Sequence, residues 1–132
     1  DTILIPEQSA AAINSDAVKT SAGALYKIPI CRTWNQKMSL QFLKDSGLQL
    51  VSCTEKTTRS LYEPDFNNPT AIIMGSEEDG VSPEYLKMSD FKAKIPMNGK
   101  ISSLNVSVAS AIIIYEAIRQ REWTLTNSEN IV

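Results

Sequence analysis

TAIIMGSEEDG, residues 70–80, is the stretch that decides the fold class of this chain. Its first half, Thr70–Met74, is a continuous apolar run, which predicts a strand covered on both faces, as in a parallel sheet. A loop with two glycines, Gly75 and Gly80, follows the strand, and Pro83–Met88 then has the pattern of a short helix. A strand that leads through a loop into a helix is the repeating unit of an α/β fold.

The same alternation extends from this stretch in both directions. Further strands are predicted over residues 2–5, 28–31, 48–53 and 91–95. Helical character is predicted over residues 15–25, ending near Gly23. Further helices are predicted over residues 38–46 and 105–121, and a polar tail follows from Thr124. The pattern predicts an α/β domain with a mostly parallel sheet and helices on both faces. Ligands of such sheets bind beyond the carboxyl ends of the strands, so the loops after Cys53, Met74 and Ile95 are candidate sites.

Composition and charge limit the classes of function. The 132 residues fit one domain, and 42% hydrophobic with 21% charged residues is typical of a globular protein. The longest apolar stretches, residues 71–74 and 111–115, are far shorter than the ~20 residues of a membrane span. No basic and apolar leader opens the chain, so we expect a cytoplasmic protein. Because the net charge is −2, binding to nucleic acid would depend on a local patch or on a partner domain. Candidates for such a patch, more simply explained as a solvated face, are Lys87, Lys92, Lys94 and Lys100.

The counts of histidine and cysteine limit the kinds of catalytic site, metal site and disulfide that the chain can form. The chain has no histidine, which excludes a histidine-based catalytic triad and argues against a catalytic zinc site, so we expect no metal. Its two cysteines, Cys31 and Cys53, lie in apolar runs, which predicts buried free thiols rather than a disulfide.

The first candidate loop is Met74–Ser82, with three consecutive acidic residues between its glycines. It lacks the Gly-Lys-Ser/Thr of a phosphate-binding P-loop, and its acids would repel a phosphate. A glycine loop of this kind suits a neutral or cationic ligand that carries hydroxyl and amine donors. The alternative is a solvated acidic turn in which Ser82 caps the helix at Pro83.

The second candidate loop is Ile95–Ala109, which leads from a predicted strand into the longest helix. Ser103 and Asn105 lie where helix caps are found, and capping alone would explain them. Polar groups around an exposed helix N-terminus can also orient a substrate hydroxyl or stabilise negative charge. The local pattern leaves both interpretations open.

Together these loops resemble motifs two and three of the SpoU (TrmH-like) branch of the SPOUT methyltransferases. The likeness covers nearly the whole chain, to about Arg121, and within the branch it is greatest to the bacterial 23S rRNA guanosine 2′-O-methyltransferases. Ser21–Ala24 and Ile28–Pro29 resemble the segment that these enzymes carry between motifs one and two. The matching motif residues are Ala71–Glu77 with Gly80, Ile95–Met97, Ser102–Ala109, and Glu116, Arg119 and Gln120.

The resemblance implies a fold, a reaction and a cofactor site. Members of the branch have an α/β domain whose C-terminal part is tucked into a trefoil knot. They transfer a methyl group from S-adenosylmethionine to a ribose 2′-hydroxyl of rRNA or tRNA. By this likeness Gly75, Ile95 and Leu104 line the cofactor site, with Thr54 and Met97 as further candidates.

Three more residues match family positions that are important for activity. Glu77 would brace the loops, while Ser103 and Asn105 would position the cofactor and the ribose hydroxyl. The resemblance further implies an RNA partner and a homodimer that pairs through helices beside the cofactor site. It implies neither a membrane nor a metal partner.

One part of the family pattern is not matched. The first motif, an Asn-x-Gly…Arg segment whose arginine is thought to activate the ribose hydroxyl, would precede Asp1. We therefore expect residues 1–123 to be an N-terminally truncated methyltransferase domain, inactive or impaired alone, followed by a polar tail over 124–132. The alternatives are a non-catalytic RNA-binding module that retains the fold and an unrelated flavodoxin-like ligand-binding domain.

Overall fold

A computed structural model describes residues 1–8, 12–99 and 103–129, with side chains placed through Trp123. The chain forms two compact units, Asp1–Ser39 and Leu40–Val132. Their boundary falls inside helix α2 (Gln36–Asp45). Within the described residues, five strands form two sheets, each of them parallel, whereas the sequence pattern predicts one sheet.

The first unit contains the smaller sheet. Strand β1 (Ile3–Pro6) pairs with β2 (Ile30–Thr33) in a register that sets Ile3 beside Ile30 and Pro6 beside Thr33. Between the strands lie helix α1 (Ser15–Thr20) and the 3-10 helix η1 (Ala24–Tyr26). Asn14 caps α1 because its Oδ1 accepts hydrogen bonds from the backbone N–H groups of Asp16 and Ala17 at 3.1 and 3.0 Å.

The helical segment predicted over residues 15–25, with an end near Gly23, is divided in the structure just before that glycine. Ala22 and Gly23 have φ values of 50° and 81°, in the left-handed region that ends a helix. Residues 15–20 are therefore α-helical, and 24–26 form the separate 3-10 turn.

The second unit is built on a three-stranded sheet with the order β4-β3-β5. Its strands are β3 (Gln49–Cys53), β4 (Thr70–Ile73) and β5 (Phe91–Ala93). The register pairs Val51 of the central strand with Ile72 on one side and Phe91 on the other. Leu50, Val51 and Ser52 of the central strand are fully buried. In β4, where the continuous apolar run predicts a strand covered on both faces, only Ile73 is buried and residues 70–72 are half-buried, because β4 lies at the edge of the sheet.

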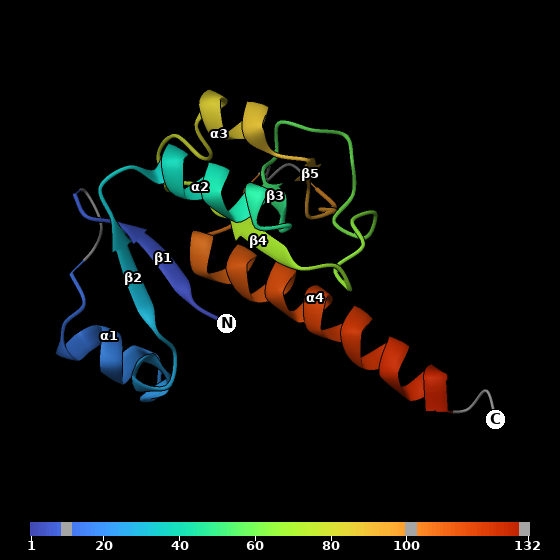
Figure 1. The fold of residues 1–132 in the computed structure, drawn as a ribbon, viewed down its shortest axis with the longest axis horizontal. Helices are drawn as coiled ribbons and strands as arrows, with labels where there is room; N and C mark the ends of the chain where they lie inside the picture. The colour runs from blue at the N-terminus through green and yellow to red at the C-terminus, as the bar shows by residue number, and fades with distance from the viewer. Residues whose placement is uncertain (9–11, 100–102, 130–132) are drawn as a thin grey trace. The chain divides into compact units, whose positions relative to one another are not determined.

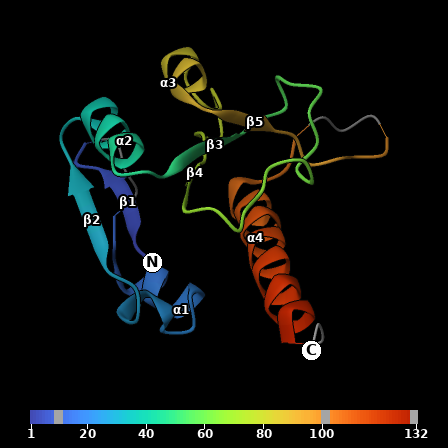
Figure 2. The same cartoon turned by 45° about the vertical axis from the view of Figure 1, so that its right-hand side comes forward.

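Helices cover both faces of this sheet, as predicted. On one face, Leu50 and Ile73 pack with Leu40 and Leu43 of α2 and with Tyr85 and Leu86 of α3 (Pro83–Met88). Helix α4 (Val106–Glu129) covers the other face, and Figure 2 shows α3 and α4 on opposite sides of β3 and β5. Ser82 caps α3 through its hydroxyl, which accepts from the Tyr85 N–H, so the predicted cap is confirmed.

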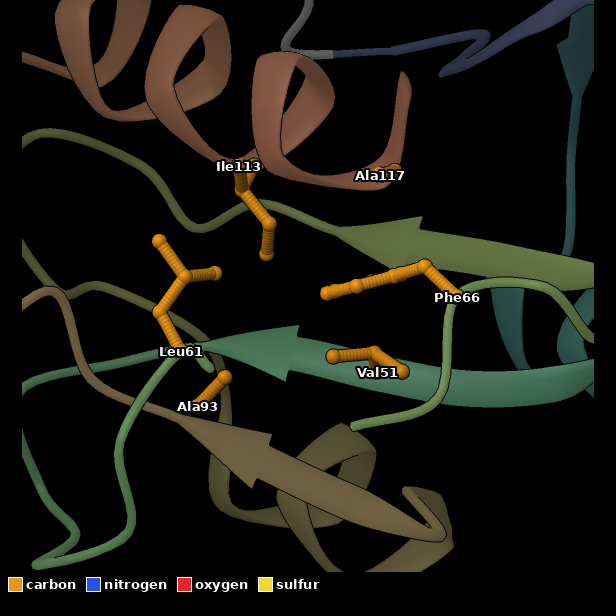
Figure 3. Packing of buried hydrophobic residues seen from close by; sticks show 6 residues of the cluster. All are labelled: Val51, Leu61, Phe66, Ala93, Ile113 and Ala117. Carbon is orange, nitrogen blue, oxygen red and sulfur yellow. The ribbon is translucent and has the colours of Figure 1, made fainter. Parts of the chain in front are cut away.

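The core beneath α4 joins the helix to the sheet and to the loop over 54–69. Ile113 points between Leu61 and Phe66 of that loop, while Val51 and Ala93 lie below them on the strands (Figure 3). All five side chains are almost completely buried. This packing fixes the carboxyl ends of the strands relative to the start of α4.

Polar contacts from α4 also hold the loop over 54–69. The buried carboxylate of Glu116 accepts hydrogen bonds from Arg119 Nε and Nη2 and from Gln120 Nε2, at 2.7 to 2.8 Å. Gln120 in turn accepts from the Phe66 N–H at 2.9 Å and donates to the Pro64 carbonyl at 3.2 Å. Arg119 lowers the pKa of Glu116 below its ordinary value, and the Gln120 bond adds to this effect against the opposing effect of burial.

Three expectations are corrected by the structure. Helix α4 runs to Glu129 rather than ending at Arg121, so the polar tail predicted from Thr124 begins as helix (Figure 1). No Gly or Pro interrupts the sequence after Gly99, and extending an existing helix is far easier than starting one. Strand β5 ends at Ala93, two residues early. Both cysteines are free, but Cys31 is exposed and Cys53 only half-buried.

No helix in the described residues is long and apolar enough to cross a membrane.

Candidate functional site

A cleft of about 500 Å³ opens at the carboxyl ends of β3, β4 and β5, where ligands of parallel sheets bind. Its volume is in the range of small-molecule sites. The loops after the three strands and the first turn of α4 form its walls. The lining comprises Cys53–Lys56, Met74–Gly80, Lys94, Ile95, Met97, Ser103–Val106 and Ala109.

One wall is a closed ring formed by residues 76–80. The Ser76 N–H donates to the Gly80 carbonyl at 3.2 Å, and the Gly80 N–H donates back to the Ser76 carbonyl at 3.1 Å. The Ser76 hydroxyl also accepts from the Asp79 N–H at 3.1 Å. Gly80 has a φ of 69°, which favours glycine. The loop is therefore an acidic turn with residues 76–79 exposed, as the alternative interpretation expects, and this turn lines the cleft.

Gly75 permits this ring to pack against its own backbone. A Cβ atom at residue 75 would lie 2.0 Å from the carbonyl carbon of Gly80 and 2.2 Å from the Val81 nitrogen. No side chain fits there without moving the main chain. Gly75 thus allows the backbone of the loop to approach the chain itself closely.

Asn105 links this ring to helix α4. Its Oδ1 accepts from the Ser107 N–H at 3.0 Å and from the Ser107 hydroxyl at 2.6 Å, so Asn105 caps the helix. Its Nδ2 donates to Glu77 Oε1 at 2.6 Å. The cap expected at Asn105 is therefore confirmed, and the same side chain lies in the wall of the cleft.

The remaining predicted residues line the same cleft. Thr54 is buried, its N–H donates to the Ala93 carbonyl at 2.9 Å, and its hydroxyl accepts from the Lys56 N–H at 3.2 Å. Ile95 and Met97 are half-buried, while Ser103 and Leu104 are exposed. All eight residues named from the sequence thus converge on one cleft, although they come from three separate loops. Ser102 of the third motif and Lys100 of the suggested basic patch lie outside the described residues.

The charge of the cleft is mixed, with more acids than bases. Glu55, Glu77, Glu78 and Asp79 supply carboxylates, and Lys56 and Lys94 supply ammonium groups. Burial raises the pKa of the Cys53 thiol in the cleft wall, and Glu55 raises it further. Among the described residues, no cluster of three or more Cys, Asp or Glu side chains could hold a metal ion.

Two cleft residues with distinct chemistry were missed from the sequence. Lys56 reaches from the loop after β3 to the ring, where its Nζ donates to the Asp79 carbonyl at 3.4 Å. Lys94 was considered only as part of a surface patch, yet it lines the cleft while Lys87 and Lys92 are not among the lining residues. The signal that could have identified both lysines is their position one to three residues after a strand's carboxyl end.

Comparison with known proteins identifies the family of this fold and cleft. The sequence model of the SpoU rRNA Methylase family matches residues 1–115. The chain belongs to the SpoU methylase family. The match includes the loops after β3, β4 and β5 and the N-terminal part of α4, which together form the cleft.

Individual members of the SpoU family are similar to this chain in sequence and in structure. The chain is 37% identical over 119 residues to the 23S rRNA (guanosine-2′-O-)-methyltransferase RlmB of Vibrio parahaemolyticus, covering 90% of this chain and 48% of the relative. It is similar to the TrmH/SpoU tRNA modifying enzyme of A. aeolicus, with a TM-score of 0.78, 35% identity, and coverage of 96% and 65%. The SpoU methyltransferase AviRb of Streptomyces viridochromogenes, solved with AdoMet, has a TM-score of 0.80 and 28% identity, with coverage of 89% and 49%. The chain spans about half the length of the curated relatives that it matches.

Proposed function

We propose that this chain is the cofactor-binding part of an S-adenosylmethionine-dependent RNA methyltransferase that modifies a ribose 2′-hydroxyl of rRNA or tRNA. The observation that carries the proposal is the convergence of all eight motif residues on one cleft at the carboxyl ends of the strands. The names of the SpoU relatives, which include rRNA and tRNA modifying enzymes, support the choice of substrate.

The residues of the cleft fit the cofactor's chemistry. S-adenosylmethionine, when bound, supplies a methyl group activated by a sulfonium. Ile95, Met97 and Leu104 offer apolar contacts for its adenine ring. The carboxylates of the cleft favour its cationic sulfonium and amino groups, since opposite charges attract at short range.

The same cleft has groups that can orient a ribose hydroxyl. The Ser103 side chain is exposed at the cleft wall, so its hydroxyl can donate to or accept from a ligand. Asn105 uses Oδ1 for the helix cap and one Nδ2 proton for Glu77, which leaves its second Nδ2 proton for a ligand. Glu77 acts through Asn105 and is a positioning residue. Together these groups would hold two reactants in one orientation, which is the main requirement of methyl transfer.

The remaining features of the proposal concern the whole enzyme. Residues 1–123 are its methyltransferase domain, with the trefoil knot of the family in the C-terminal part and residues 124–132 as an appended segment. A homodimer is supported by the exposed apolar side chains of α4, namely Val108, Ile114, Tyr115 and Ile118. A cytoplasmic location is part of the proposal and agrees with rRNA or tRNA as the substrate.

Titration of the 132-residue chain with S-adenosylmethionine by calorimetry tests the proposal. Leu104→Arg is the blocking variant because Leu104 is an exposed residue of the cleft wall, where a larger cation fills the site without disturbing the core. Phe42→Arg, which alters an exposed residue outside the cleft lining, is the matched control.

We expect saturable binding to the wild type and to Phe42→Arg, and at least a tenfold loss with Leu104→Arg. A folded wild-type chain that binds no S-adenosylmethionine would contradict the proposal. In a protein of the relatives' full length, methyl transfer to rRNA or tRNA is expected, and RNA binding without transfer would point to a non-catalytic module.

A further inference from the structure

The basic side chains of the second unit differ in their partners. Lys44, Arg59 and Arg119 each form an ion pair with a carboxylate, of Asp90, Glu63 and Glu116 respectively. These three ion pairs neutralise the cations and hold the helices and loops that carry them in position. Arg59 also stacks over the Phe91 ring, with its Cζ 3.6 Å from the centroid.

The two lysines of the cleft are not neutralised in this way. In the part of the chain that the structure describes, the hydrogen bond of Lys56 Nζ goes to the uncharged Asp79 carbonyl, at 3.4 Å. Lys94 is half-buried in the cleft wall, and within the same described residues its ammonium group has neither a hydrogen bond nor an ion pair. Four carboxylates line the same cleft, yet neither lysine forms an ion pair with one of them.

The strand order separates the acidic ring from Lys94, while Lys56 reaches from the central strand to the ring. Strands β4 and β5 lie on opposite sides of β3, so the acidic ring after β4 and Lys94 after β5 come from opposite sides of the sheet. Lys56 follows the central strand. A cationic ligand group is favoured near the ring, and an anionic group is favoured toward Lys94.

We propose that Lys56 and Lys94 form a phosphate subsite that binds the 3′-phosphate of the RNA nucleotide whose ribose enters the cleft. This inference rests on the proposed function. In RNA the 2′-hydroxyl and the 3′-phosphate are attached to neighbouring carbons of the ribose. A site that reaches the hydroxyl therefore brings a phosphate close to the same wall, where an unpaired lysine gains a charged partner.

The subsite also accounts for RNA binding by a chain of net charge −2. The cleft as a whole holds four carboxylates against two ammonium groups, so the attraction for a phosphate comes from these two cations at short range and not from the net charge of the cleft. Lys56 exchanges its weak bond with the Asp79 carbonyl for the phosphate when RNA binds.

The test is the salt dependence of RNA binding, measured by fluorescence anisotropy with a short labelled single-stranded RNA of mixed sequence. Each phosphate contact contributes about 0.7 to the slope of log affinity against log salt concentration for a single strand. The variants are Lys56→Gln and Lys94→Gln, and the control is Lys87→Gln, which alters an exposed lysine of α3 outside the cleft lining. The affinity for S-adenosylmethionine is measured on the same preparations, and thermal melts confirm folding.

We expect each cleft variant to weaken RNA binding several-fold and to reduce the slope by about 0.7, with cofactor affinity within twofold of the wild type and Lys87→Gln unchanged. A loss of cofactor affinity with an unchanged RNA slope would overturn the inference, because the lysines would then hold the cofactor's carboxylate. Equal effects in all three variants, no effect in any, or no RNA binding by the wild type would overturn it as well. Cofactor binding by the wild type with unaffected RNA slopes would remove this inference alone and leave the proposed function standing.

Discussion

Asn105 Nδ2 donates a hydrogen bond to Glu77 Oε1 across 2.6 Å, and this contact joins the loop after β4 to the first turn of α4. The two residues are 28 positions apart in the chain. Because Asn105 also caps α4, one side chain determines both the start of the helix and the position of the acidic ring. The two roles can be separated by substitution.

Asn105→Ala removes the cap and the link to Glu77, whereas Asn105→Ser keeps a capping hydroxyl and removes only the link. We expect the free energy of unfolding of the alanine variant to be about 1 kcal/mol lower than that of the serine variant, since a helix cap usually contributes this much stability. Urea denaturation followed by circular dichroism gives the comparison. Both variants are expected to lose cofactor affinity, and a serine variant that binds as tightly as the wild type would show that the link has no positioning role.

Gly75→Ala is expected to reduce the free energy of unfolding by about 2–3 kcal/mol, because the new Cβ would overlap the backbone of Gly80 and Val81. Gly47→Ala is a matched comparison at an open position, where a Cβ meets nothing within 4 Å but φ is 91°. There we expect a loss of about 1 kcal/mol from the left-handed backbone alone. Equal losses in the two variants, measured by urea denaturation, would contradict the packing argument for Gly75.

The stability of the chain is expected to fall in acid partly through Glu116. Its hydrogen bonds with Arg119 lower its pKa in the folded state from the ordinary 4.5, so the carboxylate stabilises the fold fully above that value. As the pH falls through the lowered pKa, the carboxylate is protonated and this contribution is lost. The free energy of unfolding of Glu116→Gln should therefore fall less steeply than that of the wild type below about pH 4.5. Glu78→Gln, which removes an exposed carboxylate that takes no part in closing the 76–80 ring, controls for net charge, and a wild-type slope in Glu116→Gln would refute the prediction.

Cys53 offers a chemical probe of the cleft. Cys31 and Cys53 are the two cysteines of the chain, so Cys31→Ser leaves Cys53 as its single thiol. Burial and Glu55 raise the pKa of Cys53, so iodoacetamide should alkylate it more slowly than free cysteine at pH 8, with the rate increasing toward higher pH. Saturating S-adenosylmethionine should slow the reaction further, because Cys53 lines the cleft. Mass spectrometry follows the modification, and an unchanged rate with the cofactor would place the bound ligand away from Cys53.

Most of the second unit could be predicted from the sequence, because its signals are local. The apolar run at residues 70–74 and the capping serine at 82 predict a strand and a helix wherever they occur. The candidate loops followed from the rule that ligands bind beyond the strands' carboxyl ends. The resemblance added the individual residues within them, and all eight line the cleft.

Two kinds of feature could not be predicted from the sequence. One is a contact made by a long side chain, and the other is a helix boundary where neighbouring residues favour different structures. The side chain of Lys56 extends to a loop 23 residues away, which no spacing pattern encodes. The extension of α4 to Glu129 reflects continued helix growth across residues that alone favour turns. Gly23 marks the end of the first helix in the sequence, but the earlier end at Thr20 depends on a left-handed Ala22, which the sequence does not mark as a turn residue.

The closed ring over residues 76–80 keeps its shape without the side chains of its acidic residues Glu78 and Asp79. Main-chain hydrogen bonds between Ser76 and Gly80 close the ring, and the Ser76 hydroxyl accepts from a backbone N–H, so no bond of the closure uses the side chains of Glu78 or Asp79. These two positions can therefore be substituted while Gly75, Gly80 and the Glu77 link keep the shape of the wall. For protein engineering, they are the places to adapt the chain to cofactor analogues of different charge.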